Sequence, residues 1–179
     1  MTRLHPSDFA PRFGPRECAK LIEVYKPHDD DEIAEVAQSI REAGYATLAQ
    51  LTDIVRWKSP RPIRHVERST DADVQEITSI TLRSDNERVR LLALTLLPGV
   101  AWPVASVFLH WCHRDPYPIL DFRAWWSLGR TAGELDAITL EDWLAYSEAC
   151  RHWSAAYQLS MRDFDRALWA YSKMNQSSD

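Results

Sequence analysis

Two stretches of the chain place residues at a spacing that could support chemistry. The first, LLPGVAWPVASVFLHW from Leu96, sets a Pro-Gly pair between two apolar helical runs. Glycine permits a left-handed or closely approached backbone, and the amides of such a turn, with the positive end of the next helix, favour a phosphate oxygen. We therefore predict a helical hairpin over residues 85–113 that could hold a sugar-phosphate backbone without reading bases. The predicted contacts are Gly99, Val100, Ala101 and Trp102.

The second stretch, YPILDFRAW from Tyr117, carries one carboxylate, Asp121, among apolar residues. Cleavage of an N-glycosidic bond builds positive charge on the sugar, as in glycoside hydrolysis. A fixed carboxylate beside that sugar stabilises the charge and can orient or deprotonate the attacking water. Asp is also a preferred N-cap, so Asp121 could simply begin the helix FRAWWSLG. The two roles are compatible, and the sequence leaves both open.

These residues resemble the helix-hairpin-helix DNA glycosylases, which include endonuclease III and the adenine glycosylases. The segment Leu97-Pro98-Gly99-Val100 and Ala105 fit the family's hairpin pattern, and PILD, ending at Asp121, resembles the segment that carries the catalytic aspartate. The spacing from Pro103 to Asp121 agrees with the family, and Arg123 lies one position from the family's arginine. The resemblance covers residues 85–129 and implies double-stranded DNA as the partner.

The departures from the family narrow what the resemblance implies. Ala101 stands at the second glycine of the turn, which requires ordinary backbone angles there. Pro103 replaces the lysine nucleophile of the bifunctional members, so no Schiff-base lyase step is available and monofunctional base removal is expected. Pro103 also lacks an N–H that could donate to phosphate. Three scattered cysteines cannot supply the iron–sulfur motif of endonuclease III relatives, so no cofactor is expected.

One basic segment stands out in a chain whose net charge is −5. Residues 56–68, RWKSPRPIRHVER, hold five of the 21 Lys and Arg residues, His65 and one acidic residue. Such a run is commonly a solvated loop, or it can contact a nucleic-acid strand. A flipped base usually enters a pocket with aromatic walls, for which Trp57, Trp102, Trp125 and Trp126 are candidates. The further candidate DNA-contact or base-pocket residues are Arg56, Trp57, Lys58, Arg123 and Trp125.

The bulk composition indicates a globular protein with a substantial core. The 179 residues are 45% hydrophobic and include eight Trp but only five Gly, which favours helices over turn-rich β-structure. Cys18, Cys112 and Cys150 suggest neither a disulfide framework nor a metal site, and His110 and His113 lack a third ligand nearby. No apolar run approaches the roughly 20 residues of a membrane span, and no secretory signal is seen, so we expect a cytoplasmic protein without a membrane partner.

The apolar periodicity and the caps predict an all-α fold, a compact bundle of about nine helices of the helix-hairpin-helix glycosylase type. Residues 1–14 are predicted to form a flexible arm, 15–174 a single domain and 175–179 a frayed tail. Capping signals occur at Thr47, Thr70, Ser84, Thr139 and Ser160.

The function expected from these observations is monofunctional DNA base excision with Asp121 as the carboxylate. The main alternative is a DNA-binding module that kept the fold and lost catalysis, which the acidic net charge, Ala101 and Pro103 all favour. A third alternative is a protein-interaction component in which the hairpin serves only as a scaffold.

Overall fold

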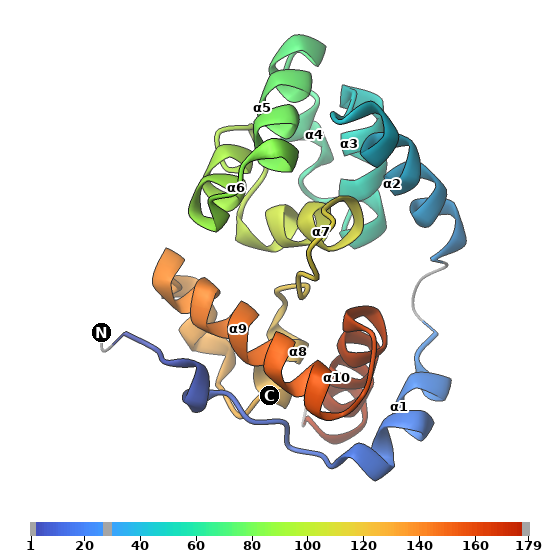
Figure 1. Cartoon of the computed structure of the whole chain (residues 1–179), viewed down its shortest axis with the longest axis vertical. Coiled ribbons are helices and arrows are strands. Elements are labelled where there is room, and N and C mark those ends of the chain that lie inside the picture. Colours follow the sequence, from blue (N-terminus) through green and yellow to red (C-terminus); the bar gives the residue numbers. More distant parts are fainter. Residues whose placement is uncertain (1–2, 27–29, 177–179) are drawn as a thin grey trace. The chain divides into compact units, whose positions relative to one another are not determined.

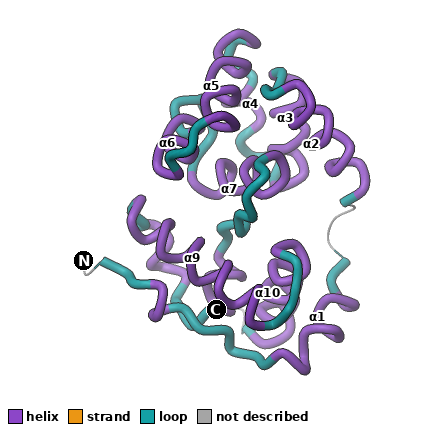
Figure 2. Tube along the Cα trace, viewed as in Figure 1, coloured by secondary structure: helices purple, strands orange, loops and turns teal. Residues whose placement is uncertain are grey.

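The structure, a computed structural model, describes residues 3–26 and 30–176. Within these ranges the chain is all-α, with ten α-helices, three short 3₁₀ helices and no strand (Figures 1 and 2). None of the described helices has both the length and the apolarity that a bilayer span requires. Where a single domain was expected for residues 15–174, the chain divides into two compact units, 3–26 with 117–176 and 30–116.

The internal unit, residues 30–116, is built around α7 (Trp102–Cys112). Six consecutive residues of α7, from Val104 to Leu109, are buried, because the helix is apolar on nearly every side. It packs against α2, α3 and α6 (Figure 1). The other helices of this unit are α2 (Asp31–Ala43), α3 (Leu48–Lys58), α4 (Ile63–Val66), α5 (Asp71–Arg83) and α6 (Glu87–Leu94).

The second unit joins the two ends of the chain, as the blue and the orange-to-red elements of Figure 1 show. Helix α10 packs against α1, α8 and α9, and the core rings include Trp125, Tyr146 and Phe164, all fully buried. Its elements are η1 (Pro6–Asp8), η2 (Pro15–Glu17), α1 (Cys18–Val24), α8 (Phe122–Ser127), η3 (Ala132–Ala137), α9 (Leu140–Ala156) and α10 (Met161–Asn175).

The N-terminal segment corrects the expectation of a flexible arm. Phe9 is 1% exposed and its ring meets Trp125 edge-to-face at 5.1 Å, while the amide of Ala10 donates to the Leu128 carbonyl oxygen at 3.1 Å. The indole of Trp153 donates to the carbonyl oxygen of Phe9 at 2.8 Å. Buried rings and paired backbone groups therefore hold residues 3–14 in place; residues 1 and 2 lie outside the described residues.

Most predicted helix starts are confirmed by side-chain caps. The hydroxyls of Thr47, Thr70, Thr139 and Ser160 each accept a hydrogen bond from the amide three residues on. The prediction at Ser84 is wrong: Asn86 caps α6, and Ser84 Oγ instead accepts from the Asn86 amide at 3.1 Å. At the predicted tail, Asn175 is the last residue of α10 and the Gln176 amide donates to Ser172; residues 177–179 lie outside the described residues.

Candidate nucleic-acid interface

The Pro-Gly turn has the backbone that its sequence predicts. Gly99 adopts φ = +79°, a left-handed conformation that favours glycine. The Val100 amide donates to the carbonyl oxygen of Leu97 at 3.1 Å, and the Val100 side chain is buried. Ala101 has φ = −89° and ψ = 176°, ordinary extended angles, so the alanine at this position is unstrained. The turn therefore links α6 to α7 without a second glycine.

Gly99 also lies against the short helix α4. A Cβ atom at Gly99 would lie 2.8 Å from His65 Cβ, 3.0 Å from the carbonyl oxygen of Pro62 and 3.1 Å from the amide nitrogen of Val66. Two of these three atoms belong to backbone, which cannot move aside without shifting α4. The missing side chain of Gly99 therefore lets the 62–66 backbone approach the hairpin turn.

This approach places the arginine-rich part of the basic segment beside the turn. Arg61, Arg64 and Arg68 are exposed and form no ion pair with any described residue. The Arg64 Nε–H donates to His65 Nε2 at 3.2 Å. The three arginines outnumber the single carboxylate of this segment, Glu67, so the segment is locally positive in a chain with a net charge of −5.

The N-terminus of α7 differs from that of the capped helices because Ala101 offers no side-chain acceptor. The amides in the first turn of a helix have no intrahelical partner. Pro103 contributes no amide, so Trp102 and Val104 supply the N–H groups of this turn. Ala101 and Pro103 are exposed and Trp102 is partly exposed, so this end of α7 is accessible.

The buried Arg90 links the two ends of the hairpin, the segment before α6 and the segment after α7. Arg90 in α6 is 6% exposed; its guanidinium donates to Asp115 Oδ2 at 2.6 Å, and its Nε–H donates to the Ser84 carbonyl oxygen at 2.7 Å. Burial acts to raise the pKa of Asp115, but the hydrogen bond and charge of Arg90 outweigh it and lower that pKa. The segments before α6 and after α7 are thereby tied together.

Asp121 lies in the other unit, where it is the N-cap of α8. Its Oδ1 accepts from the amides of Arg123 and Ala124, both at 2.9 Å, and its side chain is partly exposed. The carboxylate is close enough to Tyr146 to help raise the pKa of that phenol, for which burial is the main cause. The capping role predicted for Asp121 is therefore confirmed.

The residues after Asp121 have different environments. The guanidinium of Arg123 lies over the rings of Phe122 and Trp169, at 4.8 and 5.1 Å from their centroids, which holds it beside α8. Trp125 is 0% exposed, and its Nε1–H donates to Glu134 Oε2 at 3.3 Å. A fully buried ring cannot stack on a base, so the prediction of Trp125 as a pocket wall is corrected: it is a core residue.

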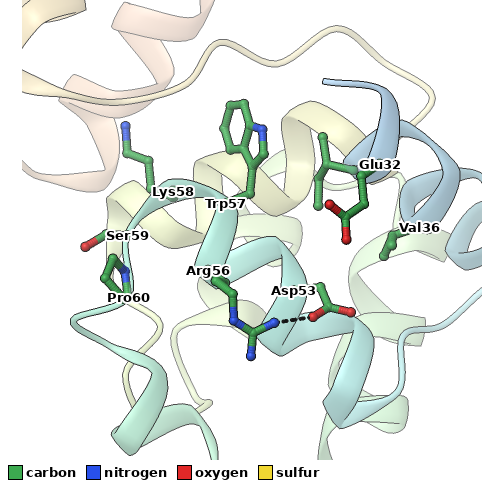
Figure 3. A pocket seen from close by; sticks show the side chains of 9 residues that line it. Glu32, Val36, Asp53, Arg56, Trp57, Lys58, Ser59 and Pro60 are labelled. Carbon is green, nitrogen blue, oxygen red and sulfur yellow. Dashed lines mark hydrogen bonds and ion pairs between the residues drawn. The ribbon is translucent and has the colours of Figure 1, made fainter. Parts of the chain in front are cut away.

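The structure brings together Arg56, Trp57 and Lys58, which line one pocket of about 290 Å³ between α2 and the end of α3 (Figure 3). Arg56 donates to Asp53 Oδ1, three residues earlier on α3, at 2.5 Å. Trp57 is partly exposed and meets Trp111 edge-to-face at 5.5 Å. The three residues therefore line part of one concave site.

The basic run is visible in the sequence, but its pattern predicts neither α4 nor the position of Arg61, Arg64 and Arg68 on and next to that helix. A glycine in the turn was a signal of close backbone approach, yet nothing in the sequence named the segment that approaches. That information comes from the packing of residues 62–66 on Gly99.

No group of three or more His, Cys, Asp or Glu side chains within residues 3–26 and 30–176 is arranged to hold a metal ion. Cys18, Cys112 and Cys150 are buried free thiols. Comparisons of the chain with protein-family models, curated proteins and solved structures each found no significant match. The case for a function therefore depends on the residues described above.

Proposed function

We propose that this protein binds duplex DNA through the hairpin turn and the adjacent arginine segment, and removes a base by monofunctional hydrolysis with Asp121 as the carboxylate. The observation that carries the proposal is the contact of Gly99 with residues 62–66, which brings the segment that carries the exposed Arg61, Arg64 and Arg68 against the turn before α7. Backbone amides and arginines are the groups that proteins use to hold DNA phosphates.

The turn and the arginines would divide the work of binding. The amides of Trp102 and Val104 can donate to one phosphate oxygen, with support from the helix dipole of α7. The exposed guanidinium groups can neutralise neighbouring phosphates and release their counterions. Neither contact reads base edges, so this surface would position the DNA and leave base choice to another part of the protein.

The chemistry proposed for Asp121 is hydrolysis of the bond between C1′ of deoxyribose and the base. As that bond breaks, its electron pair leaves with the base nitrogen and positive charge develops on the sugar ring. The carboxylate stabilises this charge and accepts a proton from the water that attacks C1′. Asp121 Oδ1 is fixed by two amides of α8, so the carboxyl group has a defined orientation.

A second candidate function is DNA binding without base removal. It is favoured by the hydrogen bonds of Asp121, since capping α8 is sufficient reason for a carboxylate there. The burial of Trp125 removes one of the aromatic walls expected of a base pocket. Both candidates share the hairpin surface and differ only in the role of Asp121.

The two candidates separate in an excision assay. Duplexes that carry uracil, an alkylated purine, oxidised guanine or a mismatched adenine are incubated with the protein, and abasic sites are cleaved with alkali. We expect excision of at least one lesion and a loss of at least about 100-fold in Asp121→Asn. Asn caps helices as well as Asp, so this variant keeps the start of α8.

Asp73→Asn is the matched control, because Asp73 is an exposed carboxylate in the first turn of α5. It should cleave like the parent protein. Excision that persists in Asp121→Asn would remove Asp121 from the mechanism. DNA binding with no excision of any lesion would favour the second candidate.

A further inference from the structure

The pocket between α2 and α3 is lined by apolar, aromatic and acidic side chains as well as basic ones, unlike the hairpin surface. Besides Arg56, Trp57 and Lys58, it is lined by Glu32, Ile33, Val36, Asp53, Ser59 and Pro60 (Figure 3). It combines one aromatic ring, several apolar side chains and two carboxylates. We infer that this pocket binds the guanine base of a nucleotide, a function that requires neither Asp121 nor the hairpin turn.

The size and walls of the pocket suit a single planar ring system. Its volume of about 290 Å³ lies just below the range of small-molecule sites, roughly 300–1,000 Å³. Trp57 lies at one side of the pocket (Figure 3). Its ring meets that of Trp111 edge-to-face at an interplanar angle of 82°, and this contact fixes the orientation of the Trp57 ring. Base stacking on such a ring is tolerant of base identity, so discrimination must come from the polar groups.

Two carboxylates, Glu32 and Asp53, supply acceptors to the pocket beside the donors Arg56 and Lys58. In Figure 3 the carboxylate of Glu32 points from α2 toward α3, and it forms no hydrogen bond or ion pair with any described residue. Asp53 uses Oδ1 to accept from Arg56 at 2.5 Å, and no described residue donates to its Oδ2. An ionised carboxylate only accepts, so the ligand that suits these oxygens must present N–H donors.

Guanine is the base whose edge fits a carboxylate best. Its N1–H and N2–H₂ groups are adjacent donors that can meet the two oxygens of one carboxylate. Adenine and cytosine instead present an amino group next to a ring acceptor, which would face a lone pair, and uracil and thymine place one N–H between two carbonyls. Glu32 therefore selects guanine by repelling the acceptors of the other bases.

Lys58 offers a contact for the phosphate of the nucleotide, in addition to the contacts that the pocket offers to the base. Its side chain projects on the same side of α3 as the Trp57 ring (Figure 3). An ammonium group there would meet the phosphate of a nucleotide whose base lies against Trp57. The guanine could come from a free nucleotide or from an unpaired position in a DNA strand, and both sources present the same base edge.

The first test measures binding of GMP, AMP, CMP and UMP to the full chain by isothermal titration calorimetry. We expect GMP to bind at least about tenfold more tightly than AMP, on the scale of discrimination by one bidentate pair. In Glu32→Gln the side chain gains an NH₂ donor and loses one acceptor. GMP affinity should then fall by about tenfold or more, and the preference for GMP over AMP should disappear.

Glu35→Gln is the matched control, because Glu35 is an exposed carboxylate of α2 that does not line the pocket. It should keep the affinity and preference of the parent protein. A second arm repeats the comparison with single-stranded oligonucleotides that contain one guanine or one adenine. Guanine preference that depends on Glu32 in the oligonucleotide alone supports the site with DNA as its source.

Equal binding of the four nucleotides, or no guanine preference in either arm, would overturn the inference. Equal loss in Glu32→Gln and Glu35→Gln would also overturn it, because the effect would then be one of charge alone. Base excision and duplex binding are read in separate assays with Asp121 and arginine variants. Failure of the guanine site is therefore distinguishable from failure of the proposed function.

Discussion

Gly99 meets two conditions that no other residue type satisfies together. Its φ of +79° lies in the left-handed region, and a Cβ there would come within 3.1 Å of three atoms of residues 62–66. The resemblance of the turn to known hairpins concerns residue identity alone, whereas these two conditions concern backbone geometry and packing. They explain why glycine stands here even if the turn binds nothing.

Replacing Gly99 by alanine should lower the free energy of unfolding by about 2–5 kcal/mol. Left-handed backbone costs an alanine roughly 1–2 kcal/mol, and overpacking against α4 adds about 1–3 kcal/mol. The control is Gly133→Ala, since a Cβ at Gly133 has no atom within 4 Å. That variant should stay within about 0.5 kcal/mol of the parent in urea denaturation. Equal unfolding midpoints for the two variants would contradict the close approach of α4.

At the scale of single residues, the sequence predicted turn and cap residues better than it predicted which side chains are buried. Gly99 and Asp121 have the backbone and the capping role expected of them. Trp125 does not, since adjacent tryptophans leave open which ring is buried, and the structure buries Trp125 fully and leaves Trp126 partly exposed. Which of two neighbouring rings enters the core is decided by tertiary packing, here by Phe9 from the far end of the chain.

At the scale of elements, local chemistry determined most helix starts. Thr47, Thr139 and Ser160 cap their helices as predicted, because a hydroxyl at that position satisfies an amide within the same turn. Helix α4 escaped prediction because it spans only four residues after two prolines. The N-terminal segment escaped for another reason: its partners, such as Trp153, lie more than 100 residues away.

The N-terminal segment should contribute to stability through Phe9. Phe9→Ala removes a ring that is 1% exposed and lies between Trp125 and Tyr146, so we expect a loss of about 3–5 kcal/mol. Phe122→Ala is the matched control, because Phe122 is 47% exposed and should cost about 1 kcal/mol or less. Both are measured by urea denaturation. A flexible segment would instead give the two variants similar, small effects.

For the whole molecule, net charge is a poor guide to local potential. The chain carries −5, yet the short segment 61–68 holds three exposed arginines, Arg61, Arg64 and Arg68, that form no ion pair among the described residues. A net charge of −5 favours weak non-specific binding to nucleic acid away from this segment. The division into two units was likewise not predicted, because the second unit is formed by segments from opposite ends of the chain.

The salt dependence of duplex binding is the most direct test of the central claim, that the turn and its neighbouring arginines hold the DNA backbone. The observed affinity should fall with a slope of about −0.9 per neutralised phosphate on logarithmic axes. Replacing Arg61, Arg64 and Arg68 by Gln should make that slope shallower by about 2–3. Replacing the exposed Arg16, Lys20 and Lys173 by Gln removes the same charge from the other unit and should leave the slope nearly unchanged. Equal slopes for the two triple variants, or no measurable binding by the parent protein at low salt, would contradict the claim.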